Sequence, residues 1–230
     1  MKKIQIYLFA YIFFMPLTLF GQKVSPTVSY THEGDYLEVT SIEDAQAPLE
    51  AAFKANPENM EGHTVAYEWH FRKRDTSKSL QELFVRYEED TQYTFNESGS
   101  YEVTLKFFID NDEEAWDSTT ISIFIADSWL EFPNAFSPNG DGLNDVFKAK
   151  DNHKSIIEFH AYIINRWGQK LFDWTNPADG WDGKHHGKDV PDGVYFLLVK
   201  ARGADGKDYN IRKDVNLLRK HIDGGTTGGK

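Results

Sequence analysis

A glycine-rich stretch past the middle of the chain carries the residue types best suited to hold an ion or a partner. It reads Asn139-Gly140-Asp141-Gly142-Leu143-Asn144-Asp145. Carboxylate and amide oxygens are calcium ligands, although the spacing and the bidentate glutamate of an EF-hand are missing here. Glycine suits backbone positions with positive φ, and Asn or Asp side chains cap their own turns. We therefore predict a rigid recognition turn, with a calcium site as the alternative, whose candidate ligands are Asn139, Asp141, Asn144 and Asp145.

Two further polar clusters contain metal-ligating residue types. The acidic stretch from Asp110 to Glu114 offers carboxylates for calcium, but a run of like charges is usually a solvated loop. His185 and His186 lie close in sequence to Asp182 and Asp189, yet adjacent histidines in a polar loop rarely converge on one ion. We therefore predict no metal and no cofactor at these positions.

Three tryptophans, Trp69, Trp167 and Trp181, would offer a platform for stacking on sugar rings if they were exposed. Side chains two positions apart on a strand share a face, so Trp69 lies on the same face as Tyr67 and Phe71. That grouping favours a place in the hydrophobic core.

The sequence contains none of the short motifs that mark a nucleophile with its base. Cysteine is absent, and neither Gly-x-Ser-x-Gly nor His-Glu-x-x-His occurs. The carboxylates of Glu88, Glu89 and Asp90 are consecutive, and neighbours on a strand point to opposite faces rather than at one substrate. We predict a non-catalytic protein.

Composition narrows the class of partner. The chain has 230 residues and a formal net charge of -11, and its longest basic cluster is Arg72-Lys73-Arg74. An acidic surface repels phosphate backbones and anionic headgroups, so we predict no nucleic-acid partner. Because there is no cysteine, the folded parts are not held together by disulfides.

The N-terminus has the pattern of a secretory signal. Met1-Lys2-Lys3 precedes a mostly apolar run from Ile4 to Phe20, and Gly21-Gln22 follows it. A basic start, an apolar middle and a small residue before a polar one are typical of a cleaved signal peptide. The alternative is an uncleaved anchor, but the run is short for a bilayer span. We predict a signal peptide over residues 1–21.

Beyond it, a hydrophobic period of two dominates, which is typical of β-strands. Tyr101 to Phe107 and Ile121 to Ile125 alternate in this way. Only Ala45 to Lys54 has a helical composition. The run from Val194 to Val199 is apolar on both faces, which favours a central strand covered on both sides.

Turn signals separate these runs and divide the chain into two units. We predict an all-β fold with two tandem Ig-like antiparallel β-sandwiches of roughly 100 residues each, joined near residues 126–130. The first covers residues 22–127 and the second 128–220. The Gly- and Thr-rich residues 221–230 are expected to form a flexible tail.

Four ordered motifs in the second unit resemble a known family. They span Phe132–Phe147, Asn165–Gly168, Gly180–Gly183 and Pro191–Tyr195. They are similar to the gliding motility-associated C-terminal domain, which is the type B sorting domain of type IX secretion substrates. The sorting-motif residues are Pro138, Asn139, Gly140, Asp141, Gly142, Asn144, Asp145, Phe147, Arg166, Trp167, Gly168, Trp181, Asp182, Gly183, Asp192, Gly193 and Tyr195.

This resemblance implies a bacterium with an outer membrane. It implies export through the periplasm to the outer surface or the medium, with outer-membrane type IX translocon components as partners. The first unit resembles a PKD or related Ig-like domain through Tyr67–Phe71, Tyr93–Phe95 and Gly99–Leu105.

We therefore expect an exported, non-catalytic cell-surface or secreted protein. Its first unit would serve for binding or adhesion to an unknown surface ligand, either a protein or a polysaccharide. The alternative is a structural or docking component of the cell envelope or of the secretion and gliding machinery, which would retain its C-terminal domain.

Overall fold

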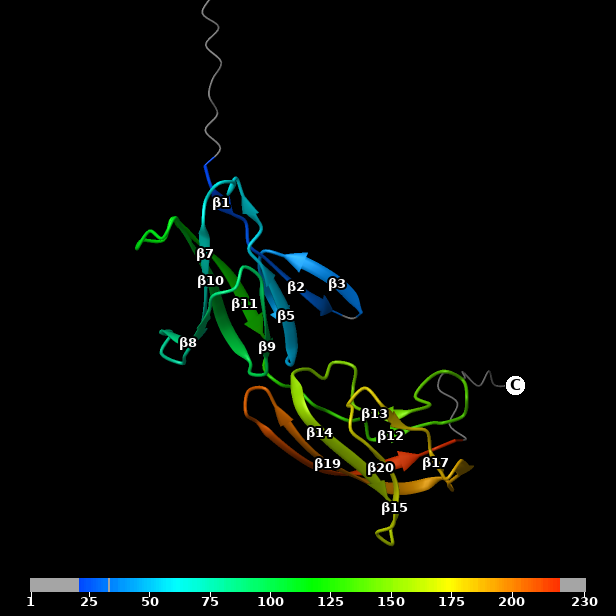
Figure 1. Ribbon diagram of the computed structural model, residues 1–230. Coiled ribbons are helices and arrows are strands. Elements are labelled where there is room, and N and C mark those ends of the chain that lie inside the picture. Colours follow the sequence, from blue (N-terminus) through cyan, green and yellow to red (C-terminus); the bar gives the residue numbers. More distant parts are fainter. Residues whose placement is uncertain (1–20, 33, 220–230) are drawn as a thin grey trace, which may run out of the picture.

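The computed structural model describes residues 21–32 and 34–219. The predicted tail, and the predicted signal peptide except for its last residue, lie outside these residues. Within them every regular element is a β-strand (Figure 1), which confirms the predicted all-β fold with two Ig-like sandwiches. No helix found there has the length and apolarity needed to span a membrane.

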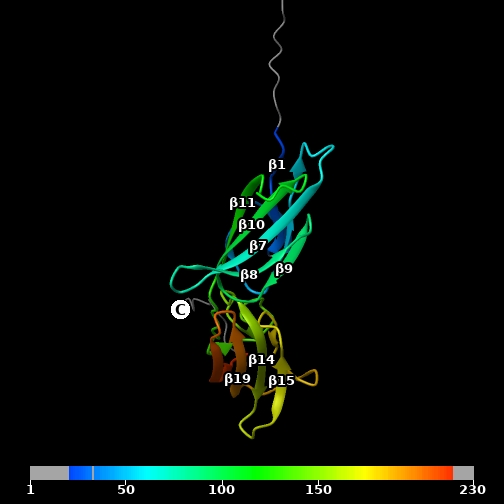
Figure 2. The same ribbon diagram turned by 60° about the vertical axis from the view of Figure 1, so that its left-hand side comes forward.

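The first sandwich packs two sheets face to face (Figure 2). Its strands are β1 (Lys23–Val24), β2 (Thr27–His32), β3 (Asp35–Val39), β4 (Ile42–Ala45), β5 (Leu49–Lys54), β6 (Pro57–Glu58), β7 (Val65–Arg74), β8 (Leu80–Arg86), β9 (Thr91–Phe95), β10 (Gly99–Ile109) and β11 (Asp117–Ile125). One sheet has the order β4-β11-β10-β7-β8 and the other β3-β2-β5-β9, while β1 pairs with β6. Strand β4 runs parallel to β11, and the other pairings are antiparallel.

Aromatic rings fill the space between these two sheets. Phe53 on β5 contacts Trp69 and Phe71 on β7, with ring centroids 5.8 Å and 5.3 Å apart. All three side chains are at most 1% exposed. The indole N–H of Trp69 donates to the carbonyls of Glu88 and Glu89, both at 3.1 Å. Alternation along β7 therefore sends Trp69 into the core, as the sequence predicts.

The second sandwich has one large sheet and two small ones. Its strands are β12 (Ala135–Phe136), β13 (Phe147–Lys148), β14 (Ile156–Ile164), β15 (Lys170–Trp174), β16 (Gly180–Trp181), β17 (Lys184–His185), β18 (Lys188–Asp189), β19 (Gly193–Gly203) and β20 (Asp208–Leu217). The large sheet has the order β12-β20-β19-β14-β15, and the pairs β13-β16 and β17-β18 are separate. Again one short strand, β12, pairs parallel, here with β20.

The predicted helical character of Ala45 to Lys54 is wrong. The segment forms the end of β4 and all of β5. Leu49, Ala51 and Phe53 on β5 are buried, whereas Glu50 is exposed. This period of two matches the pleat, so burial against the opposite sheet overrides the helix propensity of the Leu-Glu-Ala-Ala sequence.

The expectation that Val194 to Val199 is covered on both faces is also wrong. Strand β19 is central in its sheet, and Tyr195, Leu197 and Val199 are buried. On its other face Val194 is 50% exposed, and Phe196 is only partly buried. An antiparallel sheet needs cover on one face only, and this sheet has its packed layer on one side.

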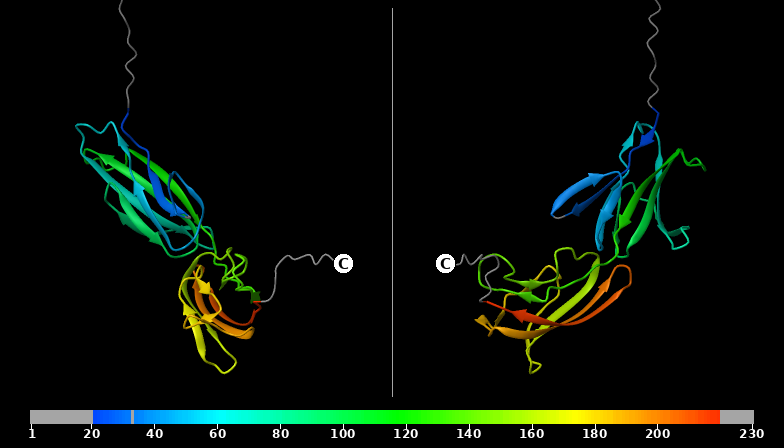
Figure 3. Two further views of the ribbon diagram at one scale, coloured as in Figure 1. Left: turned by 90° about the vertical axis from the view of Figure 1, so that its right-hand side faces the viewer. Right: turned by 180° about the vertical axis from the view of Figure 1, so that it is seen from behind.

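The two sandwiches are joined end to end through buried contacts (Figure 3). The hydroxyl of Ser155, which is 1% exposed, donates to the Ala126 carbonyl at 2.6 Å and accepts the Ala47 N–H at 3.2 Å. The Ser98 N–H donates to the Ala204 carbonyl at 3.1 Å. Ala204 also belongs to the hydrophobic cluster of the first sandwich. Backbone groups on both sides of the linker are therefore tied together.

A second set of contacts fastens the linker to the second sandwich. The Ser128 hydroxyl donates to the Asp205 carboxylate at 2.7 Å and lies 2.9 Å from the Tyr209 hydroxyl. Burial raises the pKa of Asp205, but hydrogen bonds from Ser128 and from the Lys207 N–H outweigh burial and place it below its ordinary value. The linker is therefore held at both of its ends.

Candidate functional site

The glycine-rich turn between β12 and β13 is held by its own acidic side chains. The Asp145 carboxylate accepts the N–H groups of Gly140 at 2.7 Å and Gly142 at 2.8 Å. These two bonds lower the pKa of Asp145. Both glycines have positive φ, at 82° and 86°, which a side chain would strain. Asn139 and Asp141 accept the next N–H groups along the turn, at 3.0 Å and 2.9 Å.

Side-chain oxygens of Asn139, Asp141 and Asp145, three of the four proposed calcium ligands, therefore accept backbone amides. This geometry fits the recognition-turn interpretation. Across residues 21–32 and 34–219, no three His, Asp or Glu side chains form a group that could hold a metal ion. The turn presents two apolar side chains to solvent, since Leu143 is 57% and Val146 43% exposed.

The base of the turn is anchored in the second core. Phe147 is 0% exposed and contacts Phe136, with ring centroids 5.6 Å apart. Phe136 in turn contacts Trp181 at 5.4 Å. The Ser137 hydroxyl donates to the Leu218 carbonyl at 3.0 Å. These contacts fix both ends of the turn to the second core.

Gly180-Trp181-Asp182-Gly183 is a packing motif. Trp181 is fully buried, and its indole N–H donates to the Lys184 carbonyl at 2.7 Å. A Cβ at Gly180 would collide with the Phe147 carbonyl oxygen, so only glycine allows β16 to approach β13 this closely. The Asp182 carboxylate accepts the Lys184 N–H at 3.0 Å. The motif therefore packs against β13 and Phe136, at the two ends of the glycine-rich turn.

Arg219, which follows the last strand, is an important residue that the sequence reasoning missed. Its guanidinium donates to the carbonyls of Gly183, at 2.7 Å, and Val190. It also pairs with the Asp192 carboxylate at 3.2 Å. One side chain therefore ties the end of β20 to the segment between β16 and β19, which contains β17 and β18. A basic residue directly after an alternating strand was the available signal, but its targets are distant in sequence.

Tyr195 makes a side chain–backbone hydrogen bond that Tyr101 repeats in the first sandwich. The Tyr195 hydroxyl donates to the Pro191 carbonyl at 2.7 Å, and the Tyr101 hydroxyl donates to the Glu97 carbonyl at 2.9 Å. Each tyrosine thus bonds a carbonyl four residues upstream, as in the tyrosine corner of Ig-like sandwiches. Burial raises the pKa of both phenols. Tyr195 and its neighbours therefore serve the fold.

The Asn165–Gly168 motif forms the tip of the β14–β15 hairpin. The Asn165 side chain accepts the N–H groups of Trp167 at 3.0 Å and Gln169 at 3.1 Å. Trp167 is 76% exposed, and the Arg166 guanidinium lies 4.5 Å from its ring centroid. This tip presents an aromatic ring with a cation on it.

The structure brings most of the predicted sorting residues together. The glycine-rich turn, Gly180–Gly183 and Tyr195 share the contacts of Phe136 and Trp181. The hairpin tip with Trp167 lies at the end of β14 and β15 (Figure 1), next to the start of β19, and the charge of Arg166 acts on the Tyr195 phenol. Two surfaces, the turn and the tip, are therefore available to a partner.

The remaining candidates fall elsewhere. Trp69 and Trp181 are buried, so of the three tryptophans only Trp167 is exposed. Asp110 accepts the Thr64 N–H at 3.0 Å and lies 2.8 Å from the Nδ1 atom of His63, which lowers its pKa. It begins the polar connection between β10 and β11.

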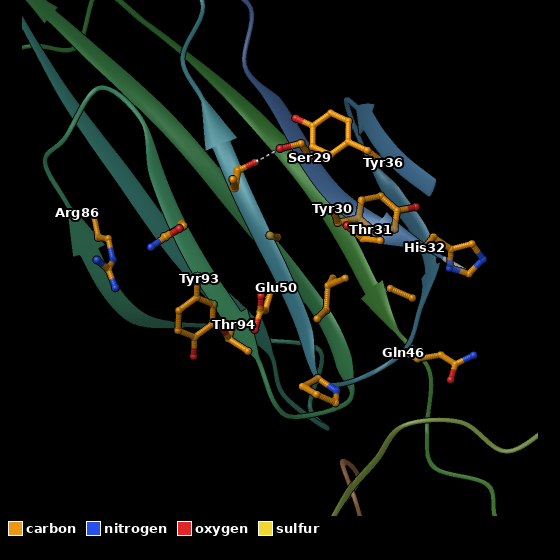
Figure 4. Close-up of a pocket in the computed structure, with 16 residues that line it drawn as sticks. Ser29, Tyr30, Thr31, His32, Tyr36, Gln46, Glu50, Arg86, Tyr93 and Thr94 are labelled. Carbon is orange, nitrogen blue, oxygen red and sulfur yellow. Dashed lines mark hydrogen bonds between the residues drawn. The ribbon is translucent and has the colours of Figure 1, made fainter. Parts of the chain in front are cut away.

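A hollow of about 1020 Å³ lies over the four-stranded sheet of the first sandwich (Figure 4). Its lining combines three tyrosines, Tyr30, Tyr36 and Tyr93, with polar side chains such as Glu50. Sequence reasoning missed this site, because the hollow depends on how β2, β3, β5 and β9 are placed side by side. The tyrosine and polar content of these strands was the only signal.

The fold defines a protein of two β-sandwiches whose second unit carries a glycine-rich turn held by its own side chains. Residues 130–213 match the family model described as the CHU_C type IX secretion signal domain, which is the family that the sequence motifs indicated. Such a domain sends its chain to the outer cell surface or the extracellular medium, and it interacts with the secretion system. No curated protein matches the chain.

The chain is similar, at low identity, to several solved structures. One is SGBP-B from the mixed-linkage glucan utilization locus of Bacteroides ovatus, in complex with a mixed-linkage heptasaccharide. It is 12% identical, the match covers 77% of this chain and 42% of that chain, and the TM-score is 0.26. The FN1-FN3 domains of chicken CNTN1 are 11% identical, the match covers 85% of this chain and 89% of that chain, and the TM-score is 0.24. Drosophila N-cadherin EC1-4 is 16% identical, the match covers 85% of this chain and 51% of that chain, and the TM-score is 0.21. The chain thus spans less than half of the first of these structures.

Proposed function

We propose that this protein is a non-catalytic binding or adhesion protein of the bacterial surface or medium. In this proposal the type IX signal domain delivers the first sandwich, and outer-membrane translocon components bind the second. The observation that carries the proposal is the match of residues 130–213 to the signal-domain family. The lined hollow on the first sandwich supports a binding role for the delivered part.

The positions of the carboxylates support the non-catalytic part of this proposal. The Asp90 carboxylate accepts the Ala55 N–H at 3.1 Å, and the Glu88 carboxylate accepts the Tyr87 N–H at 3.1 Å. Retaining and inverting glycosidases need two carboxylates on facing walls of a cleft. Glu50 is the single carboxylate that lines the hollow, as far as the structure describes it.

A second candidate function has its own support in the junction between the sandwiches. The buried hydrogen bonds of Ser155 and Ala204 fasten the second unit to the first. A unit meant only for disposal does not need such contacts. They favour a docking component of the envelope or secretion machinery that keeps its C-terminal domain.

The test is a deletion of residues 128–230 in the native host, followed by fractionation of periplasm, outer surface and medium. We expect the whole chain at the surface or in the medium and the truncated chain in the periplasm. Arrival of both forms at the same place would contradict the sorting role. Mass spectrometry of the delivered protein separates the two candidates, because peptides from residues 128–219 persist only if the domain is retained.

Attachment of cells to surfaces tests the binding part. A strain without the protein should attach less than wild type, and a chain without residues 22–127 should fail to restore attachment. Full restoration by that shortened chain would place the binding activity in the second unit and refute this part of the proposal.

A further inference from the structure

The hollow exists because a strand hairpin diverges from its sheet. Strand β2 pairs with β5 only over Thr27–Ser29, opposite Ala52–Lys54. Beyond Ser29, β2 continues to pair with β3 as far as His32. Figure 4 shows the resulting space, with residues of β2 and β3 on one side and residues of β8 and β9 on the other.

Aromatic rings line both sides of this space. Tyr36 is 64% exposed. Tyr30 is partly buried and its ring centroid lies 6.5 Å from that of His32. On the opposite side Tyr93 packs against the core while it also lines the hollow. A tyrosine ring offers a flat apolar face with a polar hydroxyl at its edge.

Five polar side chains of the hollow are without a hydrogen bond or ion pair among the described residues. Glu50, Gln92 and Thr94 project from β5 and β9, with Arg86 and Gln46 at the margins (Figure 4). None of these five side chains makes a hydrogen bond or an ion pair to any residue in the described ranges. Hydrogen-bond donors and acceptors of both kinds are therefore available to a ligand.

Small residues lie between these groups. Ala52 on β5 shares a face with Glu50, whereas Ala51 next to it faces the core and is 3% exposed. Ala45, which is 1% exposed, lies at one end. The Ser29 hydroxyl is occupied, since it donates to the Ala52 carbonyl at 3.4 Å. The small Ala52 side chain lets a ligand approach the sheet, but it offers little of the large apolar surface found in the core of protein interfaces.

We propose that this hollow binds a neutral glycan chain. Sugar rings carry C–H faces that stack on tyrosine and hydroxyls that need donors and acceptors, and the hollow offers both. Glu50 and Arg86 oppose each other in sign, and a net charge of -11 disfavours acidic polysaccharides. The volume of about 1020 Å³ exceeds what a single sugar ring needs, which fits a segment of a polymer. The inference deepens the proposed binding role and rests on it.

Affinity electrophoresis of the purified chain without residues 1–21 tests this inference. The gels contain one of five neutral polysaccharides: β-1,4-glucan as hydroxyethylcellulose, laminarin, xyloglucan, arabinoxylan or galactomannan. We expect retardation by at least one of them. Calorimetry with oligosaccharides of the retained polymer should then show an affinity about tenfold lower for Tyr36→Ala than for wild type.

Tyr87→Ala is the matched control. Tyr87 is 70% exposed and does not line the hollow, so its loss should leave affinity unchanged. Gln92→Ala, which removes a donor and an acceptor without removing a ring, should also weaken binding. Circular dichroism and thermal unfolding confirm that each variant is folded.

Two results would overturn the inference. One is a folded wild-type chain that none of the five polysaccharides retards, and the other is equal affinity of the Tyr36 and Tyr87 variants. The attachment assay distinguishes this failure from failure of the proposed function. If attachment depends on residues 22–127 but no polysaccharide retards the purified chain, the binding role stands and neutral glycans are rejected as its ligand.

Discussion

At the scale of single residues, the acidic side chains of the glycine-rich turn act on their own backbone. Asp145 accepts two amides across the turn, and Asn139 and Asp141 cap it further along. The sequence predicts such a turn because Asn, Asp and Gly are the residues that tolerate it. It could not show which carboxylate spans the turn, since that depends on the path of the backbone.

Asp145→Asn should lower thermal stability at neutral pH. The amide has one acceptor oxygen where the carboxylate has two, so one N–H of the turn loses its bond. Because the folded state depresses the pKa of Asp145, its stabilising effect is present at pH 7 and is lost as the pH falls through the folded pKa. Melting curves at pH 7 and pH 3 should therefore show a gap between variant and wild type that narrows in acid. A gap of equal size at both pH values would refute this role.

The aromatic residues show where strand alternation predicts burial and where it does not. Trp69 shares a face with Tyr67 and Phe71, and all three are buried. Trp167 lies in a turn, where no period applies, and its exposure had to come from the structure. The same holds for Tyr36, whose place in the hollow depends on the cross-strand partner Thr31. Position along one strand is readable from sequence, whereas position across strands is not.

At the scale of elements, period-two patterns located the strands better than composition did. The runs Tyr101–Phe107 and Ile121–Ile125 lie in β10 and β11, which pair as neighbours. Composition was misleading for β5, whose helix-forming residues adopt a strand between β2 and β9. For β19 the apolar pattern correctly indicated a central strand, but it could not tell that only one face has a packed layer.

The repeated tyrosine corner gives an element-scale prediction. Tyr101→Phe and Tyr195→Phe each remove one hydroxyl that bonds a carbonyl. Each change should cost about 1 kcal/mol of unfolding free energy, measured by chemical denaturation. Tyr87→Phe, at an exposed position, serves as the control and should be neutral. A neutral result for both corner variants would contradict the structural role of the hydroxyls.

At the scale of the whole molecule, the decisive contacts join residues far apart in sequence. Ser155 bonds both Ala47 and Ala126, and Arg219 bonds Gly183. No local pattern marks these residues, because Ser and Arg are common on surfaces. The motifs of the second unit were recognisable through family resemblance, whereas the junction and the hollow required the folded arrangement.

Ser155→Ala should uncouple the two sandwiches. The change leaves the Ala47 N–H and the Ala126 carbonyl buried without this partner, at a cost of about 1–3 kcal/mol. Differential scanning calorimetry should show the unfolding transition of the variant broadened or split relative to wild type. Ser118→Ala, at an exposed position on β11, should leave the transition unchanged. Identical traces for both variants would show that the Ser155 hydroxyl does not couple the units.

The bond from Ala47 to Ser155 has a consequence for the ligand site as well. Ala45, Gln46 and Pro48 form one margin of the hollow, and the amide between them is held by the second sandwich. Removal of that sandwich after export would free this margin to fluctuate, and ordering a flexible segment costs binding free energy. We expect the intact precursor to hold its ligand more tightly than the trimmed form. Cleavage between the two sandwiches would then lower the affinity of the hollow for its ligand at the same moment that it removes the sorting domain.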